Sequence, residues 1–334
     1  MNKLYDLKDV SIIPSAVSDV YSRKECNPNY DNGKLPVFNA PMSVLMSDTG
    51  DIDKLYESSI NLVIPRSFSL DDRLQFLKTY PLAFIAIGMG EMDEVSVFVE
   101  ENKISKPKIL IDIANGHMKK LIDMCAEMKK NFPSMEIMAG NIANPETLLA
   151  YERAGIDYVR CSVGSGFGCI TTPSTGVFYP LGSLIRDCRR IKNENNLKIK
   201  IIADGGIDAF SKICKCLALG ADYVMSGKMV AQCEDLNESG VFTVSDTGAK
   251  MREYFGMASH KGQAAMKLAK LKTEEGRCVN IDVKYTLSSL TTLISDYIRS
   301  SMSYCNCRDI KEFVSGNVKI AFISENSSVI FDRN

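Results

Sequence analysis

The stretch GSGFGCITT (164–172) places one cysteine and two threonines directly after a run of glycines. A thiolate on a flexible loop beside backbone N–H groups is a competent nucleophile, which makes Cys169 a candidate for covalent catalysis. Thr171 follows two residues later, where its hydroxyl group could relay a proton. The competing interpretation is that Cys169 is one of the buried, inert cysteines that are common in proteins.

The stretch KTEEGR (272–277) supplies further groups for acid–base chemistry. One of its two glutamates could serve as a general acid or base beside a bound substrate. Taken alone, such a stretch is more typical of a solvated run of charges.

Two shorter motifs indicate an anion site. ADGG (203–206) and SGK (226–228) each end an apolar run, and backbone N–H groups in such turns bind phosphate. The side chain of Lys228 either adds charge to this site or points to solvent. Asp204 either accepts hydrogen bonds from the two hydroxyl groups of a ribose or caps the next helix.

These residues follow regularly spaced apolar runs that alternate with stretches of helical periodicity. Continuously apolar strands with amphipathic helices between them indicate a parallel sheet covered by helices. Eight such units predict an α/β fold, a TIM (β/α)8 barrel that spans residues 1–334 as a single domain. The eight runs are 35–42, 61–66, 83–90, 108–116, 136–141, 157–166, 200–206 and 222–229.

The ends of the predicted strands are rich in small and polar residues. In a TIM barrel the carboxyl ends of all strands meet at one face, where active sites lie. Glycines alone could simply make the turns, but so many beside Asp, Asn, Cys and Lys indicate a shared pocket. ADGG and SGK would follow the seventh and eighth strands, where barrels often bind phosphate. Within this domain, residues 231–285 predict a hairpin followed by a mobile active-site loop.

The composition excludes several classes of protein. The 334 residues carry a net charge of -1, which gives no electrostatic reason to expect nucleic acid or a membrane surface as a partner. No apolar run is long enough to span a bilayer, and the amino terminus lacks a signal peptide, so we expect a cytoplasmic protein. The eleven cysteines are odd in number and lack zinc-finger spacing, so we expect neither a disulfide framework nor a zinc site.

Seven motifs in order resemble the IMP dehydrogenase/GMP reductase family. They are NAPMS, DIANGH, IMAGNI, GSGFGCITT, IIADGGI, ADYVMSGKMVA and YFGMAS. The resemblance runs from about residue 6 to residue 313. In this family the dehydrogenase oxidises IMP to XMP with NAD, whereas the reductase deaminates GMP and reduces it to IMP with NADPH. Both branches form a covalent adduct between a cysteine and the purine.

Three features resemble the reductase branch. Only SFSLDD (67–72) separates the second strand from its helix, where typical dehydrogenases insert regulatory CBS domains. DIANGH resembles the DVANG motif of reductases, and KTEEGR resembles their segment that ends in Glu-Gly-Lys. The Arg-Tyr pair that activates water in dehydrogenases is not found in the sequence. The resemblance therefore implies an NADPH-dependent GMP reductase that acts on purine nucleotides (GMP and IMP).

The resemblance also implies a role for each site residue. Cys169 would attack C2 of the purine, and Thr171 and Glu275 would carry protons to the departing ammonia. The substrate-binding residues would be Asp204, Gly205, Gly206, Ser226, Gly227, Lys228, Tyr254, Gly256, Met257, Ala258 and Lys272. The cofactor-binding residues would be Ser22, Arg23, Asp112, Ala114, Asn115, Gly116, Ser300, Ser301 and Ser303. The carbonyl groups of Gly164, Gly166 and Cys169 would hold a monovalent cation, K+.

The implied assembly is a homotetramer in which the cofactor crosses a subunit boundary. The cofactor could be NADPH or NADH, because the 2′-phosphate needs a cation such as Arg23 or Arg66 and the sequence does not place either residue.

Several residues depart from the family pattern. Phe167 stands where a serine usually contacts the phosphate, and Gly168 replaces a β-branched residue. Ser43 replaces the usual Asp, Thr172 replaces the arginine of reductases, and Lys228 replaces a small residue. These departures leave two alternatives open: an IMP dehydrogenase without CBS domains, and a nucleotide-binding protein that has lost catalysis.

Overall fold

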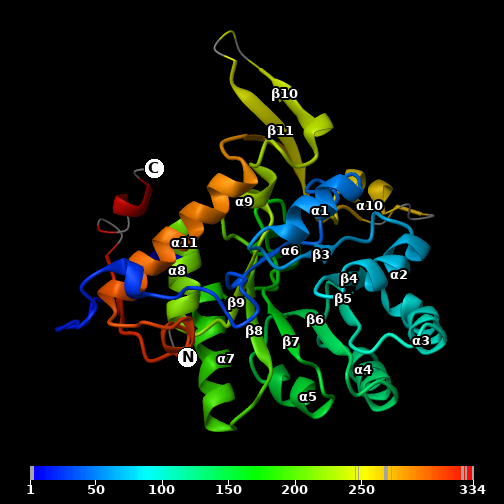
Figure 1. Ribbon diagram of the computed structural model, residues 1–334, viewed down its shortest axis with the longest axis horizontal. Helices are drawn as coiled ribbons and strands as arrows, with labels where there is room; N and C mark the ends of the chain where they lie inside the picture. Colours follow the sequence, from blue (N-terminus) through cyan, green and yellow to red (C-terminus); the bar gives the residue numbers. More distant parts are fainter. Residues whose placement is uncertain are drawn as a thin grey trace.

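The computed structural model describes residues 4–244, 246, 248–266, 270–271, 273–324, 327 and 329–332. Eight parallel strands form one sheet with the order β2-β9-β8-β7-β6-β5-β4-β3. Helices surround this sheet, as Figure 1 shows. Each strand coincides with one of the eight predicted runs, except that β6 extends one residue beyond its run, so the predicted TIM barrel is confirmed.

The barrel strands and their helices alternate along the chain. The strands are β2 (Val37–Asn39), β3 (Val63–Ile64), β4 (Phe84–Ile87), β5 (Lys108–Asp112), β6 (Glu136–Ile142), β7 (Tyr158–Cys161), β8 (Lys200–Asp204) and β9 (Tyr223–Ser226). The helices that follow them are α1 (Thr49–Glu57), α2 (Leu70–Thr79), α3 (Met92–Glu101), α4 (Lys119–Asn131), α5 (Thr147–Arg153), α6 (Thr171–Thr175) with α7 (Leu181–Glu194), α8 (Phe210–Leu219), and α9 (Lys228–Ala231) with α11 (Leu287–Tyr304).

A buried asparagine closes the barrel between β2 and β3. A single parallel bridge joins Phe38 to Asn61 at this seam. The side chain of Asn39 donates to the Val63 carbonyl oxygen at 2.8 Å and accepts from the Val63 amide at 2.8 Å. Asn39 is completely buried, so its amide group replaces the ladder that the short strand β3 cannot supply.

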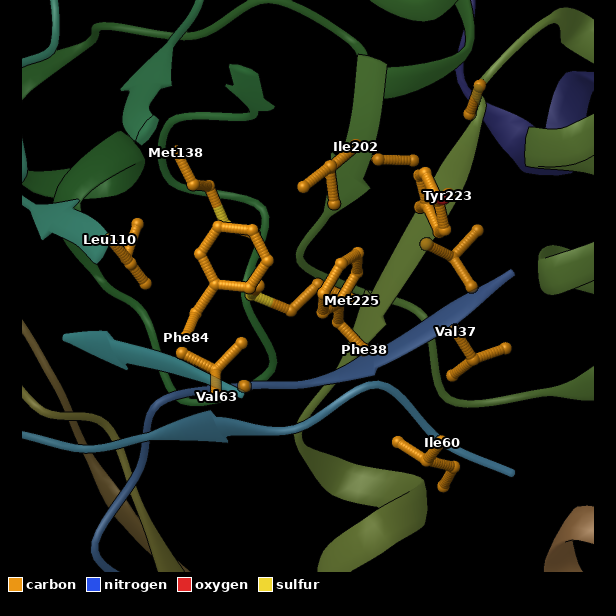
Figure 2. Close-up of a cluster of buried hydrophobic side chains, with 14 of the residues drawn as sticks. Val37, Phe38, Ile60, Val63, Phe84, Leu110, Met138, Ile202, Tyr223 and Met225 are labelled. Carbon is orange, nitrogen blue, oxygen red and sulfur yellow. The ribbon is translucent and has the colours of Figure 1, made fainter. Parts of the chain in front are cut away.

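Large side chains fill the barrel interior (Figure 2). The ring of Phe38 packs against Phe84, Tyr158 and Tyr223, with centroid distances between 5.0 and 6.3 Å. The edge-on and tilted geometries of these pairs are those that aromatic rings prefer. The interior below the site is therefore a packed core that holds the strand ends in place.

The helices are amphipathic, and polar side chains begin several of them. In α4, Leu121, Cys125 and Met128 recur at the spacing of one helical face and are buried. The side chain of Asp48 caps α1 and that of Ser69 caps α2, each by accepting from a backbone amide in the first turn.

A small sheet projects from the barrel between α9 and α11 (Figure 1). In residues 231–285, β10 (Val241–Thr243) and β11 (Lys250–Phe255) form an antiparallel hairpin. The chain then passes through α10 (His260–Ala265) and returns as β12 (Cys278–Asp282), which pairs with the other edge of β11. Residues 273–277 lead directly into β12, which is hydrogen-bonded to β11 along its length.

Further elements lie near the two ends of the chain. β1 (Val10–Ile12) pairs with β13 (Ile320–Phe322) in an antiparallel ladder. The 3₁₀ helix η2 (Arg23–Glu25) lies beside α11, which α12 (Ile310–Phe313) follows. Among the described residues, no helix combines the length and the apolar character that a membrane crossing requires.

Candidate active site

A cavity opens at the carboxyl ends of the barrel strands, with about 750 Å³ of empty space, open solvent included. The loops after β2, β7, β8 and β9 form its walls, together with the turn after β11. The predicted site residues that line it are Asp112, Gly166, Cys169, Asp204, Gly205, Gly206, Gly227, Lys228, Tyr254, Gly256 and Met257. The structure therefore brings together residues that lie far apart in the sequence.

A chain of hydrogen bonds joins the candidate nucleophile to the candidate acid–base residue. The Cys169 thiol donates to the Thr171 hydroxyl oxygen at 3.2 Å. The Thr171 hydroxyl in turn donates to Oε2 of Glu275 at 2.6 Å. The direction of these bonds favours movement of the thiol proton toward the carboxylate, which would leave a thiolate on Cys169.

Backbone hydrogen bonds hold Glu275 beside the nucleophile loop. The Ile170 amide donates to the Glu275 carbonyl oxygen at 3.0 Å, and the Glu275 amide donates to the Ala258 carbonyl oxygen at 3.1 Å. Gly276 forms a bridge with Cys169, and a Cβ atom on it would lie 2.6 Å from the Ser259 amide. Only glycine therefore fits at this crossing. The predicted substrate residue Lys272 lies outside the described residues.

Asp204 belongs to an ion network that the sequence motifs do not predict. Oδ2 of Asp204 accepts from Arg160 at 2.9 Å and from the Asn141 amide group at 2.7 Å. The other end of the Arg160 guanidinium binds Asp112 at 2.5 Å. Although burial acts in the opposite direction, Asp204 and Asp112 raise the pKa of Arg160. The network fixes both carboxylates at the edge of the cavity, and Ala209, not Asp204, is the N-cap of α8.

One signal in the sequence could have revealed Arg160. It stands in DYVRCS, an otherwise apolar strand of a parallel sheet that is buried on both faces. A charged residue in such a strand must be paired, and here its partners are the two aspartates at the ends of β5 and β8.

The loops after β8 and β9 form the predicted phosphate end of the cavity. Gly205 and Gly206 have φ angles of 93° and 70°, which side chains other than glycine rarely adopt. The buried hydroxyl of Ser226 donates to the Ile207 carbonyl oxygen at 3.0 Å, which ties the two loops together. Gly227 lies close to the Tyr254 hydroxyl group, since a Cβ atom on it would come within 2.7 Å.

The side chain of Lys228 lies at the cavity wall rather than in solvent. Its ammonium group pairs with Asp208 at 3.3 Å and lies 3.7 Å from the centroid of the Phe167 ring. Lys212 binds the other oxygen of Asp208 at 2.6 Å. Burial opposes ionisation of Asp208, but hydrogen bonds and charge interactions with the two lysines lower its pKa.

The end of β11 and the turn after it supply the remaining predicted substrate residues that the structure describes. Tyr254 is buried and its hydroxyl group lies 3.3 Å from Sδ of Met42; burial raises the pKa of Tyr254. The Gly256 amide donates to the Arg277 carbonyl oxygen at 3.2 Å. Met257 lines the cavity, and the Ala258 carbonyl oxygen holds the Glu275 amide, as described above.

The predicted cofactor residues fall into two groups. Asp112 ends β5 and lines the cavity, and Ala114, Asn115 and Gly116 follow it, with Ala114 and Asn115 exposed. Ser300 and Ser301 line a second cavity beside α11, which shares Asp208 and Lys228 with the first.

The remaining cofactor candidates line neither cavity. Ser22 caps η2, Arg23 pairs with Asp296 at 3.7 Å, and the Ser303 hydroxyl donates to the Ser300 carbonyl oxygen. One chain therefore does not unite the two groups of cofactor residues in one cavity of its described part.

A histidine fixes the loop that carries Ala114 to Gly116. Nε2 of His117 accepts from the Ala143 amide at 3.0 Å, and Nδ1 lies 2.9 Å from the Thr147 hydroxyl oxygen. Partial burial of the ring lowers the pKa of His117. The Tyr151 hydroxyl donates to the Gly116 carbonyl oxygen at 2.8 Å.

The residues predicted to hold a cation lie on the nucleophile loop. The Gly166 carbonyl oxygen accepts from the Cys169 amide at 2.9 Å, and Gly164 packs against the Thr172 side chain. Within the described part of the chain, His, Cys, Asp and Glu side chains form no group of three or more that could hold a metal ion. All eleven cysteines are free, and Cys169 is half-buried.

Comparisons with known proteins agree with this geometry. Residues 82–330 match the family model of the IMP dehydrogenase / GMP reductase domain. The GMP reductase of Staphylococcus epidermidis is 32% identical over 320 residues, which cover 92% of this chain and 94% of that protein. The GMP reductase of Oceanobacillus iheyensis is 32% identical over 325 residues, which cover 93% of each. The chain therefore belongs to the IMP dehydrogenase / GMP reductase family.

Proposed function

We propose that this chain is a GMP reductase, which converts GMP, NADPH and protons to IMP, NADP+ and ammonium. The observation that carries this proposal is the hydrogen-bonded series Cys169–Thr171–Glu275 at the wall of the cavity. The names of the curated relatives point to the same reaction.

The first half of the proposed reaction is a deamination. The thiol proton of Cys169 passes through Thr171 to Glu275, and the thiolate forms a bond to C2 of the purine. As the bond between C2 and the amino group breaks, Glu275 returns the proton to the leaving nitrogen, and ammonia departs. The purine then remains bonded to the sulfur of Cys169.

The second half is a reduction at the same carbon. NADPH, when bound, supplies the hydride that C2 receives. The bond between C2 and sulfur breaks, so that IMP leaves and Cys169 recovers its electron pair. Arg160 holds Asp204 in place for the ribose hydroxyl groups and Asp112 in place beside the cofactor.

The residues after β5 fit the reactive end of the dinucleotide. Ala114 and Asn115 are exposed beside Asp112, and hydrogen bonds from Tyr151 and to His117 fix the backbone around them. For the 2′-phosphate we propose Arg23, whose side chain is 55% exposed. Arg66 is a poorer candidate, because its guanidinium packs against Gly88 and pairs with Glu91.

We further propose that the active form is a homotetramer and that K+ binds to carbonyl groups of the nucleophile loop. The separation of the two groups of cofactor residues supports a site shared between subunits. Gly164 and Gly166 lie on the loop that also holds Cys169, where a cation would stabilise the loop beside the thiolate.

A spectrophotometric screen tests the proposed function. IMP, GMP and XMP are each combined with NADH, NADPH, NAD and NADP, and the reduced cofactor is followed by its absorbance. We expect NADPH oxidation with GMP together with release of ammonia. Reduction of NAD with IMP and no reaction with GMP would instead identify an IMP dehydrogenase without CBS domains. Binding of nucleotides with no turnover in any combination would identify an inactive binding protein.

A further inference from the structure

Phe167 lies between the phosphate end of the cavity and the segment that carries Glu275. Its ring packs edge-on against Tyr254, with a centroid distance of 6.0 Å. The ammonium group of Lys228 lies 3.7 Å from the centroid of the ring, and the guanidinium carbon of Arg277 lies 5.4 Å from it. Two cations thus share one aromatic ring, and each is attracted to its π electrons.

Arg277 connects this ring to the acid–base segment. Its Nε and Nη2 atoms both donate to the Phe167 carbonyl oxygen, at 3.2 and 3.1 Å. Its backbone amide donates to the Gly168 carbonyl oxygen at 2.9 Å. Arg277 follows Glu275 by two residues, so the contacts of Arg277 with Phe167 and Gly168 help to press Glu275 against the nucleophile loop.

Lys228 connects the same ring to the phosphate end. Its side chain is 20% exposed, and its ammonium group pairs with the ionised carboxylate of Asp208. Like charges repel, so Lys228 weakens the interaction between Arg277 and the Phe167 ring as long as the charge of Lys228 is not fully balanced. An anion in the cavity would bind Lys228 and reduce this repulsion.

We infer that Phe167 is a positioning residue that links binding of the anionic 5′ group to closure of residues 273–277 over Cys169. A substrate phosphate neutralises Lys228, Arg277 then binds the ring and the Phe167 carbonyl group more tightly, and Glu275 is held beside Thr171. Phe167 makes no direct hydrogen bond to the phosphate through its ring. Instead, the ring couples phosphate binding to the position of residues 273–277. The inference rests on the proposed function in one respect: the phosphate of a nucleotide substrate lies at the end of the cavity formed by the loops after β8 and β9.

Hydrogen exchange of the full chain, followed by mass spectrometry of peptides, tests this link without turnover. The reporters are the amides of Ile170, Glu275 and Arg277, which hold the closed segment. The probes are GMP, guanosine and inorganic phosphate. We expect GMP to slow exchange of these amides more than guanosine does, and inorganic phosphate alone to slow it measurably.

Substitution of Phe167→Leu removes the ring but keeps an apolar side chain. We expect the advantage of GMP over guanosine to fall roughly two- to thirtyfold, the range of a single cation–π contact. The exposed Arg277→Met change, which does not threaten the fold, should have the same effect. The matched control is Lys78→Met, because Lys78 lies 4.8 Å from the Phe98 ring on the surface of α2 and α3.

The possible results separate the inference from the proposed function. If both variants keep the full GMP advantage, or if none of the three probes slows exchange in the unmodified chain, the inference is wrong. Loss of the advantage in both variants, but not in Lys78→Met, supports it even where the chain does not reduce GMP. Turnover of GMP with exchange that is equal for GMP and guanosine would support the proposed function and contradict the inference.

Discussion

The contact between Thr171 and Glu275 is the feature of the site that most restricts its chemistry. The two residues are 104 positions apart, yet the hydroxyl group donates to the carboxylate at 2.6 Å. If residues 272–277 were only a solvated run of charges, Glu275 would not accept a hydrogen bond from Thr171. The neighbouring Glu274 instead accepts from the His260 amide, on the other side of the segment.

Thr171→Val and Glu275→Gln each interrupt the proposed proton path while keeping the size of the side chain. We expect kcat for GMP to fall by about 10²- to 10⁴-fold, the usual contribution of a general acid or base, with a smaller change in KM. Steady-state kinetics measure both constants. Glu274→Gln is the matched control and should keep kcat within a few-fold. A comparable loss of kcat in Glu274→Gln would show that removal of a negative charge, and not of the proton path, lowers kcat.

At the scale of residues, the sequence predicts the candidate nucleophile but not its surroundings. Cys169 and Thr171 are close in the chain, so their spacing alone places them together. Arg160 and Asn141 come from different strands, and the pairing of Arg160 with two aspartates depends on the barrel register. Phe167 could be recognised as a departure from the family, but its two cationic neighbours are visible only in three dimensions.

The side chain of Asn39 supplies two hydrogen bonds at the seam between β2 and β3. Asn39→Ala would leave the Val63 amide and carbonyl groups without their partner in a buried position. We expect the free energy of unfolding to fall by about 1–3 kcal/mol for each group left unpaired. Denaturant unfolding measures this change. The exposed Asn317→Ala is the control, with an expected change within about 0.5 kcal/mol. Equal changes in the two variants would show that the Asn39 side chain does not stabilise the closed barrel.

His117 should make the loop after β5 sensitive to pH. The pKa of the folded-state imidazole is lowered, so on acidification the unfolded chain takes up a proton before the folded chain does. His117 therefore costs no stability above its ordinary pKa, and stability falls as the pH drops below that value. Between neutral and mildly acidic pH, the Tm of the native chain should fall more than the Tm of His117→Gln does. A difference that does not change with pH would contradict this assignment.

At the scale of elements, the strands could be predicted because a parallel sheet buried on both faces requires continuous apolar runs. The side chain of Asn39, which bonds to the two-residue strand β3, could not be predicted to take part in the closure of the barrel. The return of the chain as β12 was also not visible. CVNID has one buried residue among exposed and half-buried ones, so its sequence does not predict the pairing with β11.

In the whole molecule, the predicted cofactor residues of α11 lie apart from those that follow β5. Ser300 and Ser301 line a second cavity, which among the described residues shares only Asp208 and Lys228 with the one that Asp112 lines. We expect light scattering to give the mass of four 37.0 kDa chains. We also expect Cys169→Ala and Arg23→Met chains, each inactive alone, to recover activity when they assemble together. A monomeric mass with full activity would contradict a shared site.

In the proposed reaction GMP is reduced through a bond between Cys169 and the purine. The most direct test is peptide mass spectrometry of the chain, quenched with acid during turnover of GMP with NADPH. We predict that the peptide containing Cys169 carries the purine nucleotide, and that Cys169→Ala binds GMP but releases no ammonia. Ammonia release by Cys169→Ala at the native rate, with no modified peptide in the native chain, would contradict the account.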